Sequence, residues 1–140
     1  MSVYLDASVL VALFTDDVLA GRADAFLRTR SPVLIVSDFA AAEFASAIAR
    51  HVRMRGIRAQ DAHRTFTNFD AWIARAAGRA LTTSADVASA AAFLRRLDLP
   101  LRTPDALNIA IAQRIGAEIL TFDDQMAASA RALGTAVLVG

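Results

Sequence analysis

Val3-Tyr4-Leu5-Asp6-Ala7-Ser8-Val9-Leu10 is the segment that decides the fold, because an aliphatic run passes through an acidic turn into a second apolar run. Short apolar runs without polar alternation are typical of strands that are buried on both faces of a parallel sheet. We therefore predict a strand over Val3 to Leu5 and a helix over Val9 to Phe14. Asp6 then lies at the carboxyl end of the first strand, in the turn that leads to the helix.

The rest of the chain alternates in the same way between aliphatic segments and segments rich in Ala, Leu and Arg. Further strands are predicted at Val33 to Val36, Glu118 to Phe122 and Ala136 to Val139, with a brief extended piece at Leu81 to Thr83. Further helices are predicted at Asp17 to Arg28, Asp38 to Arg55, Ala59 to Ala77, Ser84 to Leu97, Pro104 to Ile115 and Asp124 to Leu133. Because no linker rich in Gly or Pro interrupts this alternation, we expect a single domain over residues 1–140. Its fold class is α/β, a three-layer α/β/α sandwich with a central parallel sheet.

Several helix boundaries carry their own signals. Thr103 followed by Pro104 predicts an N-cap and a proline at the first helical position. Gly116 and Gly134 stand where helices are expected to stop. Asp86 and Asp98 are interpreted as solvated charges near helix ends.

The composition restricts the possible functions. The chain has no cysteine, so disulfides, thiolate metal sites and a cysteine nucleophile are excluded. Charged residues interrupt every apolar stretch before the ~18 residues that a membrane helix requires, and the N-terminal segment lacks the pattern of a secretory signal. We expect a soluble, cytoplasmic protein with no membrane contact. The formal net charge of +1 argues against a basic coat, so any contact with nucleic acid should be local.

Three aspartates are expected to meet at one edge of the sheet. Ligands of open parallel sheets bind beyond the carboxyl ends of the strands, where the following helices begin. Asp6 ends the first strand, Asp123 follows the strand that contains Ile119 and Leu120, and Asp105 lies in the first turn of the helix after Thr103. Each of them, taken singly, could instead be an ordinary helix cap or a charge that complements a helix dipole.

Glu43 is harder to explain as a cap, because it lies in the middle of a predicted helix. Its neighbours three and four residues away include no cation that could pair with it. A charge on an apolar helix face is costly unless a group from elsewhere in the fold compensates it, and a metal ion is one candidate. A face exposed to solvent would remove the need for any partner.

Four carboxylates in one cluster require a cation. Two of them about 4 Å apart repel each other by roughly 4 kcal/mol at an effective dielectric constant near 20. Oxygen-only ligands suit hard ions such as Mg²⁺ or Mn²⁺, which support hydrolysis of phosphodiesters. The sequence therefore predicts a magnesium or manganese site formed by Asp6, Glu43, Asp105 and Asp123, in a hydrolytic nuclease.

The same residues carry a resemblance to PIN-domain ribonucleases, and within them to the VapC toxins of bacterial toxin–antitoxin pairs. The matching segments are Asp6-Ala7-Ser8-Val9-Leu10, the Ser37 to Arg50 helix with Glu43, Leu101-Arg102-Thr103-Pro104-Asp105-Ala106-Leu107-Asn108-Ile109-Ala110, and Ile119-Leu120-Thr121-Phe122-Asp123. Their order and spacing span nearly the whole chain, and the third segment is the strongest single signal.

The resemblance implies a metal-dependent endoribonuclease that acts as a toxin on cellular RNA. It assigns the four acidic residues to the metal site and suggests that Ser8 and Thr121 support the site by hydrogen bonding. Asp124 is interpreted as a helix-start residue or an outer ligand. The resemblance also implies a homodimer and a cognate antitoxin that covers the active-site groove. Asn108 stands where relatives often have histidine, and we expect no effect of this difference on catalysis.

Other interpretations are weaker. A non-catalytic PIN-like module that binds RNA or protein would be expected to lose acidic positions, yet all four are present. Phosphoacceptor receiver domains need a lysine, and this chain has none. The cluster Arg50, Arg53, Arg55 and Arg58 could hold RNA phosphates, but a helix C-terminus commonly carries such cations. The stripe Phe66, Phe69, Trp72 and Ile73 is expected in the core or on a dimer surface.

Overall fold

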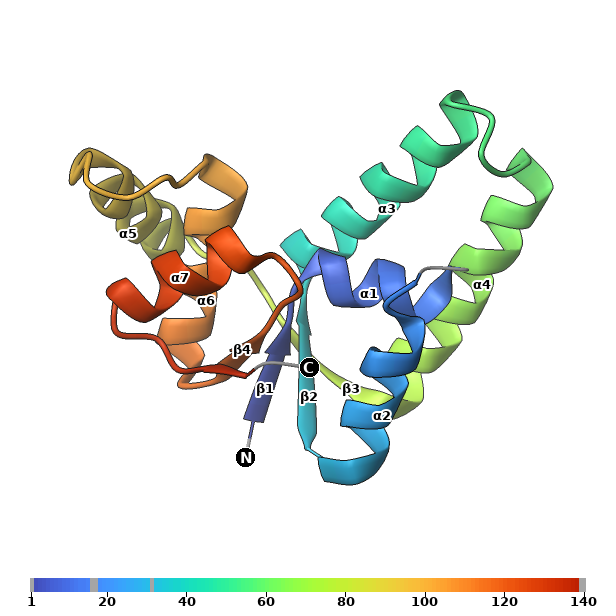
Figure 1. The fold of residues 1–140 in the computed structure, drawn as a ribbon, viewed down its shortest axis with the longest axis horizontal. Helices are drawn as coiled ribbons and strands as arrows, with labels where there is room; N and C mark the ends of the chain where they lie inside the picture. Colours follow the sequence, from blue (N-terminus) through green and yellow to red (C-terminus); the bar gives the residue numbers. More distant parts are fainter. Residues whose placement is uncertain (1, 16–17, 31, 139–140) are drawn as a thin grey trace.

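The computed structural model describes residues 2–15, 18–30 and 32–138 (Figure 1). Within them the strands are β1 (Ser2–Leu5), β2 (Val33–Ser37), β3 (Ala77–Ala80), β4 (Glu118–Leu120) and β5 (Val137–Leu138). The helices are α1 (Ala7–Phe14), α2 (Ala20–Arg30), α3 (Asp38–Arg53), α4 (Ala59–Ala76), α5 (Ser84–Arg95), α6 (Thr103–Ile115) and α7 (Asp124–Ala132). No helix in this part of the chain is long and apolar enough to cross a membrane.

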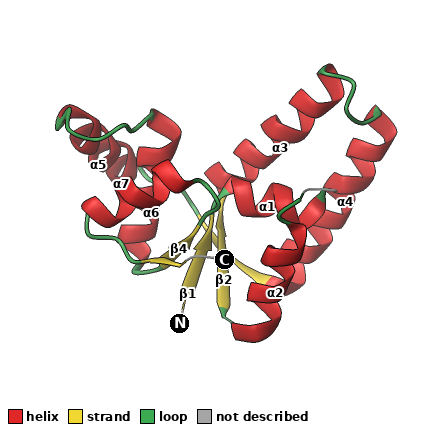
Figure 2. Cartoon of the chain, in the orientation of Figure 1, coloured by secondary structure: helices red, strands yellow, loops and turns green. Residues whose placement is uncertain are grey.

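All five strands are parallel, in the order β3-β2-β1-β4-β5. Parallel neighbours need crossover connections, and helices supply them here. Figure 2 shows the strands between two groups of helices, α1 to α4 on one side and α5 to α7 on the other. The predicted α/β/α sandwich with a central parallel sheet is confirmed.

Each face of the sheet has its own hydrophobic core, because successive side chains of a strand point to opposite faces. Val3 and Leu5 of β1 pack with buried residues of α1 to α4, whereas Tyr4 packs with buried residues of α5 to α7. Burial on both faces explains why the strands of this chain are aliphatic runs without polar alternation.

The aromatic stripe of α4 belongs to the first of these cores. The Phe69 ring stacks on the ring of Phe44 with 4.3 Å between centroids, and Phe14 makes T-shaped contacts with both Phe69 and Trp72, each with 5.4 Å between centroids. Phe66 packs against Phe44 as well. Of the two interpretations of this stripe, the structure supports the core.

The third strand differs from the prediction. The helix expected to run to Ala77 ends at Ala76, and the next residues pair with β2 as β3, whereas the piece expected to be extended, Leu81 to Thr83, is not a strand. Gly78 lies within the pairing segment, where its low helix propensity favours the end of the helix. The predicted helix start at Asp17 and strand end at Val139 lie outside the described residues.

Two smaller predictions were wrong. The N-cap of α6 is Arg102 rather than Thr103, so the helix begins one residue earlier than expected, with Pro104 in its first turn. Asp86 is not solvated: its side chain is 2% exposed and lies 2.8 Å from the guanidinium of Arg114 on α6. The sequence shows Asp86 only as an acidic residue in the first turn of a helix, and local sequence does not reveal that an arginine of another helix pairs with it. Gly116, by contrast, ends α6 in the expected left-handed conformation.

Candidate active site

Each of the four candidate acidic residues lies near the beginning of a helix, at the carboxyl edge of the sheet. Asp6 is the N-cap of α1, Glu43 lies in the second turn of α3, Asp105 in the first turn of α6, and Asp123 is the N-cap of α7. These helices come from both layers and begin where the strands end (Figure 1). The topology thus brings residues that are far apart in the sequence to one edge.

Asp6 is the most rigidly held of the four, because donors occupy both of its carboxylate oxygens. The Ser8 hydroxyl donates to Oδ1 at 2.6 Å and the backbone N–H of Val9 donates to the same oxygen at 3.2 Å, while the Thr121 hydroxyl donates to Oδ2 at 2.5 Å. The side chain is only 5% exposed. Burial raises its pKa, and the negative charge of Asp123 adds to this, although the three hydrogen bonds act in the opposite direction.

The residues expected to support the site also tie the loop after β4 to α1. The backbone N–H of Phe122 donates to Ser8 Oγ, and the N–H of Asp123 donates to Thr121 Oγ1, both at 3.0 Å. Asp123 in turn accepts from the backbone of Met126 and so caps α7. Asp124 is the first residue of α7 and is exposed. The capping interpretation therefore holds for Asp6 and Asp123 alongside any role in the site.

Glu43 does have a partner, and it comes from the other side of the sheet. The amide Nδ2 of Asn108 on α6 donates to Glu43 Oε1 at 2.7 Å. Burial raises the pKa of Glu43 from 4.5 to about 6, the charges of Asp6 and Asp105 add to this, and the Asn108 hydrogen bond opposes it. The protein partner of Glu43 is thus a neutral amide, which holds the carboxylate without neutralising its charge.

Sequence reasoning did not predict the contact of Asn108 with Glu43 or the two residues behind it. Asn108 is 2% exposed, and it contacts the hydroxyl of Tyr4, which also hydrogen-bonds Ser37 Oγ at 2.7 Å. The signal was present, because Asn108 is the single polar residue in the buried segment Ala106 to Ala112 of α6. A buried amide requires partners, so its position pointed to a polar group on the facing elements.

Asp105 and Asp123 accept fewer hydrogen bonds than Asp6. Asp105 is half-buried and accepts a hydrogen bond from the backbone N–H of Arg102 at 3.4 Å, while Asp123 is exposed. Burial raises the pKa of Asp105, and the charge of Asp123 raises it further. These two side chains have more freedom than Asp6 to change conformation.

Electrostatic effects join the four carboxylates in a ring. In addition to burial, which is the larger cause, Asp123 raises the pKa of both Asp6 and Asp105, and these two raise the pKa of Glu43. We call these four residues the acidic ring. Within the described residues, no three acidic or histidine side chains already lie at the spacing that would enclose one ion. The chemistry of the donor set nevertheless fits a hard divalent cation, because all four donors are carboxylates that repel one another.

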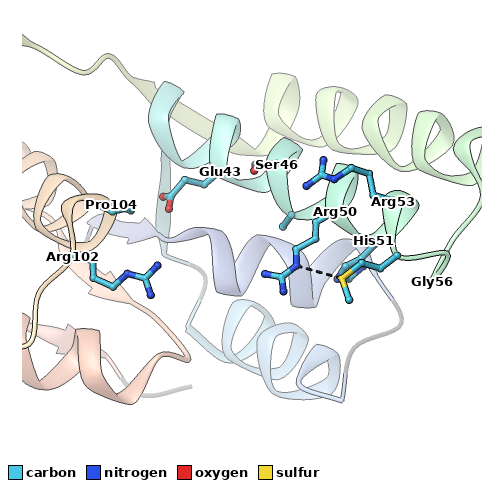
Figure 3. Close-up of a pocket in the computed structure, with 10 residues that line it drawn as sticks. Glu43, Ser46, Arg50, His51, Arg53, Gly56, Arg102 and Pro104 are labelled. Carbon is cyan, nitrogen blue, oxygen red and sulfur yellow. Dashed lines mark hydrogen bonds between the residues drawn. The ribbon is translucent and has the colours of Figure 1, made fainter.

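An open cleft of about 1050 Å³ begins at Glu43 and follows α3 toward its C-terminal end. Figure 3 shows Arg50, His51 and Arg53 along α3, with Arg102 and Pro104 at the start of α6 on the other side. We call this the α3–α6 cleft. Arg55 and Arg58 line a different hollow, so the four arginines that are close in the sequence do not form one surface.

Comparison with known proteins identifies relatives along the whole chain. A family model described as the PIN domain matches residues 3–132. Ribonuclease VapC46 of Mycobacterium tuberculosis is 31% identical, over 98% of this chain and 96% of the relative. The structure of VapC20 of M. tuberculosis, described as a toxin that cleaves the sarcin-ricin loop, superposes with a TM-score of 0.74 at 20% identity, covering 97% of this chain and 98% of that one. A toxin–antitoxin complex from Klebsiella pneumoniae gives a TM-score of 0.64 at 18% identity, with 90% of each chain covered.

Proposed function

This chain belongs to the PIN-domain family, and we propose from this premise that it is a metal-dependent endoribonuclease, the toxin of a toxin–antitoxin pair. Similarity to a ribonuclease over almost the full length of both chains supports the nuclease activity. The observation that carries the proposal is the acidic ring: four carboxylates from four helices repel one another at the edge where parallel sheets bind their ligands.

The acidic ring is proposed to hold Mg²⁺ or Mn²⁺. Asp6, Glu43, Asp105 and Asp123 would be the ligands, with Ser8 and Thr121 orienting Asp6 and with Asp124 in an outer position. When bound, a divalent cation supplies stabilisation of the negative charge that develops on a phosphodiester during hydrolysis. Three hydrogen bonds hold the carboxylate of Asp6 and a side-chain amide holds that of Glu43, while Asp105 and Asp123, which accept from backbone N–H groups, would adjust to the cation.

The α3–α6 cleft is proposed to bind the RNA backbone next to the acidic ring. Its arginines, Arg50, Arg53 and Arg102, are exposed and stand beside Glu43 along one continuous opening. Arginine can donate two hydrogen bonds to one phosphate, so these side chains suit a phosphodiester chain whose scissile group reaches the carboxylates. Such a local basic surface agrees with a chain whose net charge is only +1.

The direct test is cleavage of structured RNA by the purified protein with Mg²⁺ or Mn²⁺. We expect Asp6→Asn and Asp105→Asn to abolish cleavage, and chelation by EDTA to abolish it reversibly in the parent. Asp98→Asn is the matched control, because Asp98 pairs with Arg96 on the surface outside the acidic ring. Undiminished cleavage in both ring variants would show that a contaminating nuclease acts or that the assignment of the site is wrong.

The partners are proposed from the same family membership. We expect a small cognate antitoxin to inhibit cleavage by covering the acidic ring, and we expect the chain to form a homodimer. Light scattering at micromolar concentrations tests the dimer, and a monomeric mass would refute it. Inhibition by the product of the neighbouring gene, restored RNA cleavage after its proteolysis, and no effect of an unrelated protein would together support the antitoxin.

A further inference from the structure

A chain of four polar side chains runs through the interior behind the acidic ring. Ser37 Oγ and the Tyr4 hydroxyl are 2.7 Å apart, the Tyr4 hydroxyl donates to Asn108 Oδ1, and Asn108 Nδ2 donates to Glu43 Oε1 at 2.7 Å. The same Nδ2 donates to the backbone carbonyl of Pro104 at 3.0 Å. Tyr4 and Ser37 are fully buried, so the bonds of the Tyr4 hydroxyl are made away from water, while the bonds from Asn108 to Glu43 and Pro104 are partly buried.

The direction of every proton in this chain follows from its acceptors. The carbonyl of Pro104 and the Glu43 carboxylate can only accept, so the amide nitrogen of Asn108 must face them and its oxygen must face Tyr4. Tyr4 has one proton and gives it to that oxygen. Ser37 Oγ already accepts from the backbone N–H of Ala40, and its own proton therefore goes to the Tyr4 oxygen.

This arrangement leaves the Asn108 amide with one orientation. A rotation by 180° would place its oxygen against the Glu43 carboxylate and the Pro104 carbonyl, and its N–H groups against the hydroxyl of Tyr4. Three hydrogen bonds in a buried region would then be lost or reversed, at a large cost. The acceptors Glu43 and Pro104 thus select the nitrogen of Asn108, and the hydroxyl of Tyr4, supported by Ser37, holds the amide oxygen in the matching orientation.

The consequence for Glu43 is a fixed oxygen and an available one. Oε1 is anchored to α6, whereas within the described structure Oε2 accepts no hydrogen bond, and the side chain borders the α3–α6 cleft. Asn108 provides this anchor without adding a positive charge. An arginine in the same place would neutralise the carboxylate and compete with a cation for it, but a neutral donor leaves the full charge for the cation.

We propose that Asn108, oriented by Tyr4 and Ser37, is a positioning residue that holds Glu43 for divalent cation binding at the acidic ring. This inference rests on the proposed function, because it assumes that the ring binds a cation. The hydrogen bond between Asn108 and Glu43 also joins the two helical layers at the site, since Glu43 belongs to α3 and Asn108 to α6 on the opposite face of the sheet. The fit of the site then depends on Asn108, Tyr4 and Ser37, which are not themselves proposed to bind RNA or the cation.

The test measures Mn²⁺ affinity of the purified protein by calorimetry, RNA cleavage as a function of Mn²⁺, and thermal unfolding without Mn²⁺. Asn108→Leu keeps the size of the side chain and removes its three hydrogen bonds, and we expect Mn²⁺ affinity to fall by about 10- to 100-fold, as for other groups that orient a ligand. Tyr4→Phe changes no hydrogen bond of Glu43 itself but removes the one that holds the amide oxygen of Asn108. We therefore expect a smaller loss of Mn²⁺ affinity, roughly 3- to 10-fold. Asn68→Leu, at the only other asparagine, is the control and should bind Mn²⁺ like the parent.

Asn108→His provides the rescue, because a ring N–H can donate to Glu43 while imidazole is not a preferred ligand of Mn²⁺. We expect its affinity to lie within a few fold of the parent value, well above that of Asn108→Leu. If Asn108→Leu does not fold, Tyr4→Phe and Asn108→His still decide the question. Unchanged Mn²⁺ affinity in Asn108→Leu, or in Tyr4→Phe when the leucine variant is unfolded, would overturn the positioning role. If the parent protein binds Mn²⁺ and cleaves RNA, the proposed function stands even when the positioning role fails. If the parent protein does neither, both the proposed function and the positioning role are refuted.

Discussion

Replacing Glu43 by glutamine should make the cation-free protein more stable while destroying its site. The folded chain raises the pKa of Glu43 from 4.5 to about 6, chiefly by burial and then by the charges of Asp6 and Asp105. A shift of this size corresponds to about 2 kcal/mol against the charged form. The side chain is partly exposed, and solvent screening reduces the expected cost to about 1 kcal/mol. Glutamine escapes the cost and can still accept the hydrogen bond of Asn108 through its amide oxygen.

The pH dependence gives this prediction its sign. Because the native state holds the Glu43 proton more tightly than the unfolded chain, the contribution of Glu43 to stability decreases as the pH rises from 4.5 to about 6. At pH 7.5 the full cost is present, and at pH 4 almost none of it remains. The glutamine variant should therefore exceed the parent by about 1 kcal/mol, or roughly 3 °C in Tm, at pH 7.5 and match it at pH 4.

Urea unfolding at both pH values, in EDTA, measures this difference. Glu118→Gln is the matched control, because Glu118 is the only other glutamate and lies at the start of β4, outside the acidic ring. Addition of Mn²⁺ should reverse the order at pH 7.5, since a ligand that binds only the folded state stabilises the parent more than the variant. A glutamine variant that is less stable than the parent at pH 7.5, or equally favoured at both pH values, would refute the reasoning.

Three further outcomes test other parts of the structure. Arg114→Leu should lower the free energy of unfolding by about 2 kcal/mol, because Asp86 would keep a buried charge without its cation; a urea midpoint that does not move would contradict this. Arg102→Gln should raise KM for RNA by about 3- to 10-fold, leave kcat nearly unchanged and reduce the salt dependence of binding by about one phosphate contact; an unchanged KM would remove Arg102 from the RNA surface. Thr121→Val removes the hydroxyl that donates to Asp6 and should weaken Mn²⁺ binding about 10-fold; parental affinity would show that Asp6 needs no such support.

The sequence predicted the layers of the fold well because strands buried on both faces leave a strong local signal. Val3 to Leu5 must be apolar throughout, since alternate side chains enter different cores. The strand Ala77–Ala80 leaves no such signal. It lies at the edge of the sheet, its sequence Ala-Gly-Arg-Ala is not aliphatic, and it is extended because it pairs with β2. Pairing with a distant strand is a tertiary effect that local propensity does not contain.

The features of the site also differ in whether neighbouring residues or distant contacts determine them. The position of Asp6 or Asp123 at a strand end can be predicted from a few neighbouring residues. The partner of Glu43 could not, because Asn108 is 65 residues away and reaches Glu43 across the edge of the sheet. The sequence alone predicts no effect on catalysis of asparagine in place of histidine at this position, because it does not contain that contact. The described bond gives Asn108 a role that the measurements of Mn²⁺ affinity can now test.

The carboxylates that pair with arginine in this chain differ from two members of the acidic ring. Asp61, Asp86 and Asp98 each pair with arginine, and for Asp86, although burial acts against it, hydrogen bonds from Arg114 and Thr83 lower the pKa. The hydrogen bonds to Asp6 and Glu43 come instead from hydroxyl, amide and backbone N–H groups, and no ion pair within the described part of the chain includes them. A chain with 15 arginines has ample means to neutralise four acids. Neutral donors hold these carboxylates in place and leave their charge uncompensated, which is the condition that a site for a divalent cation requires.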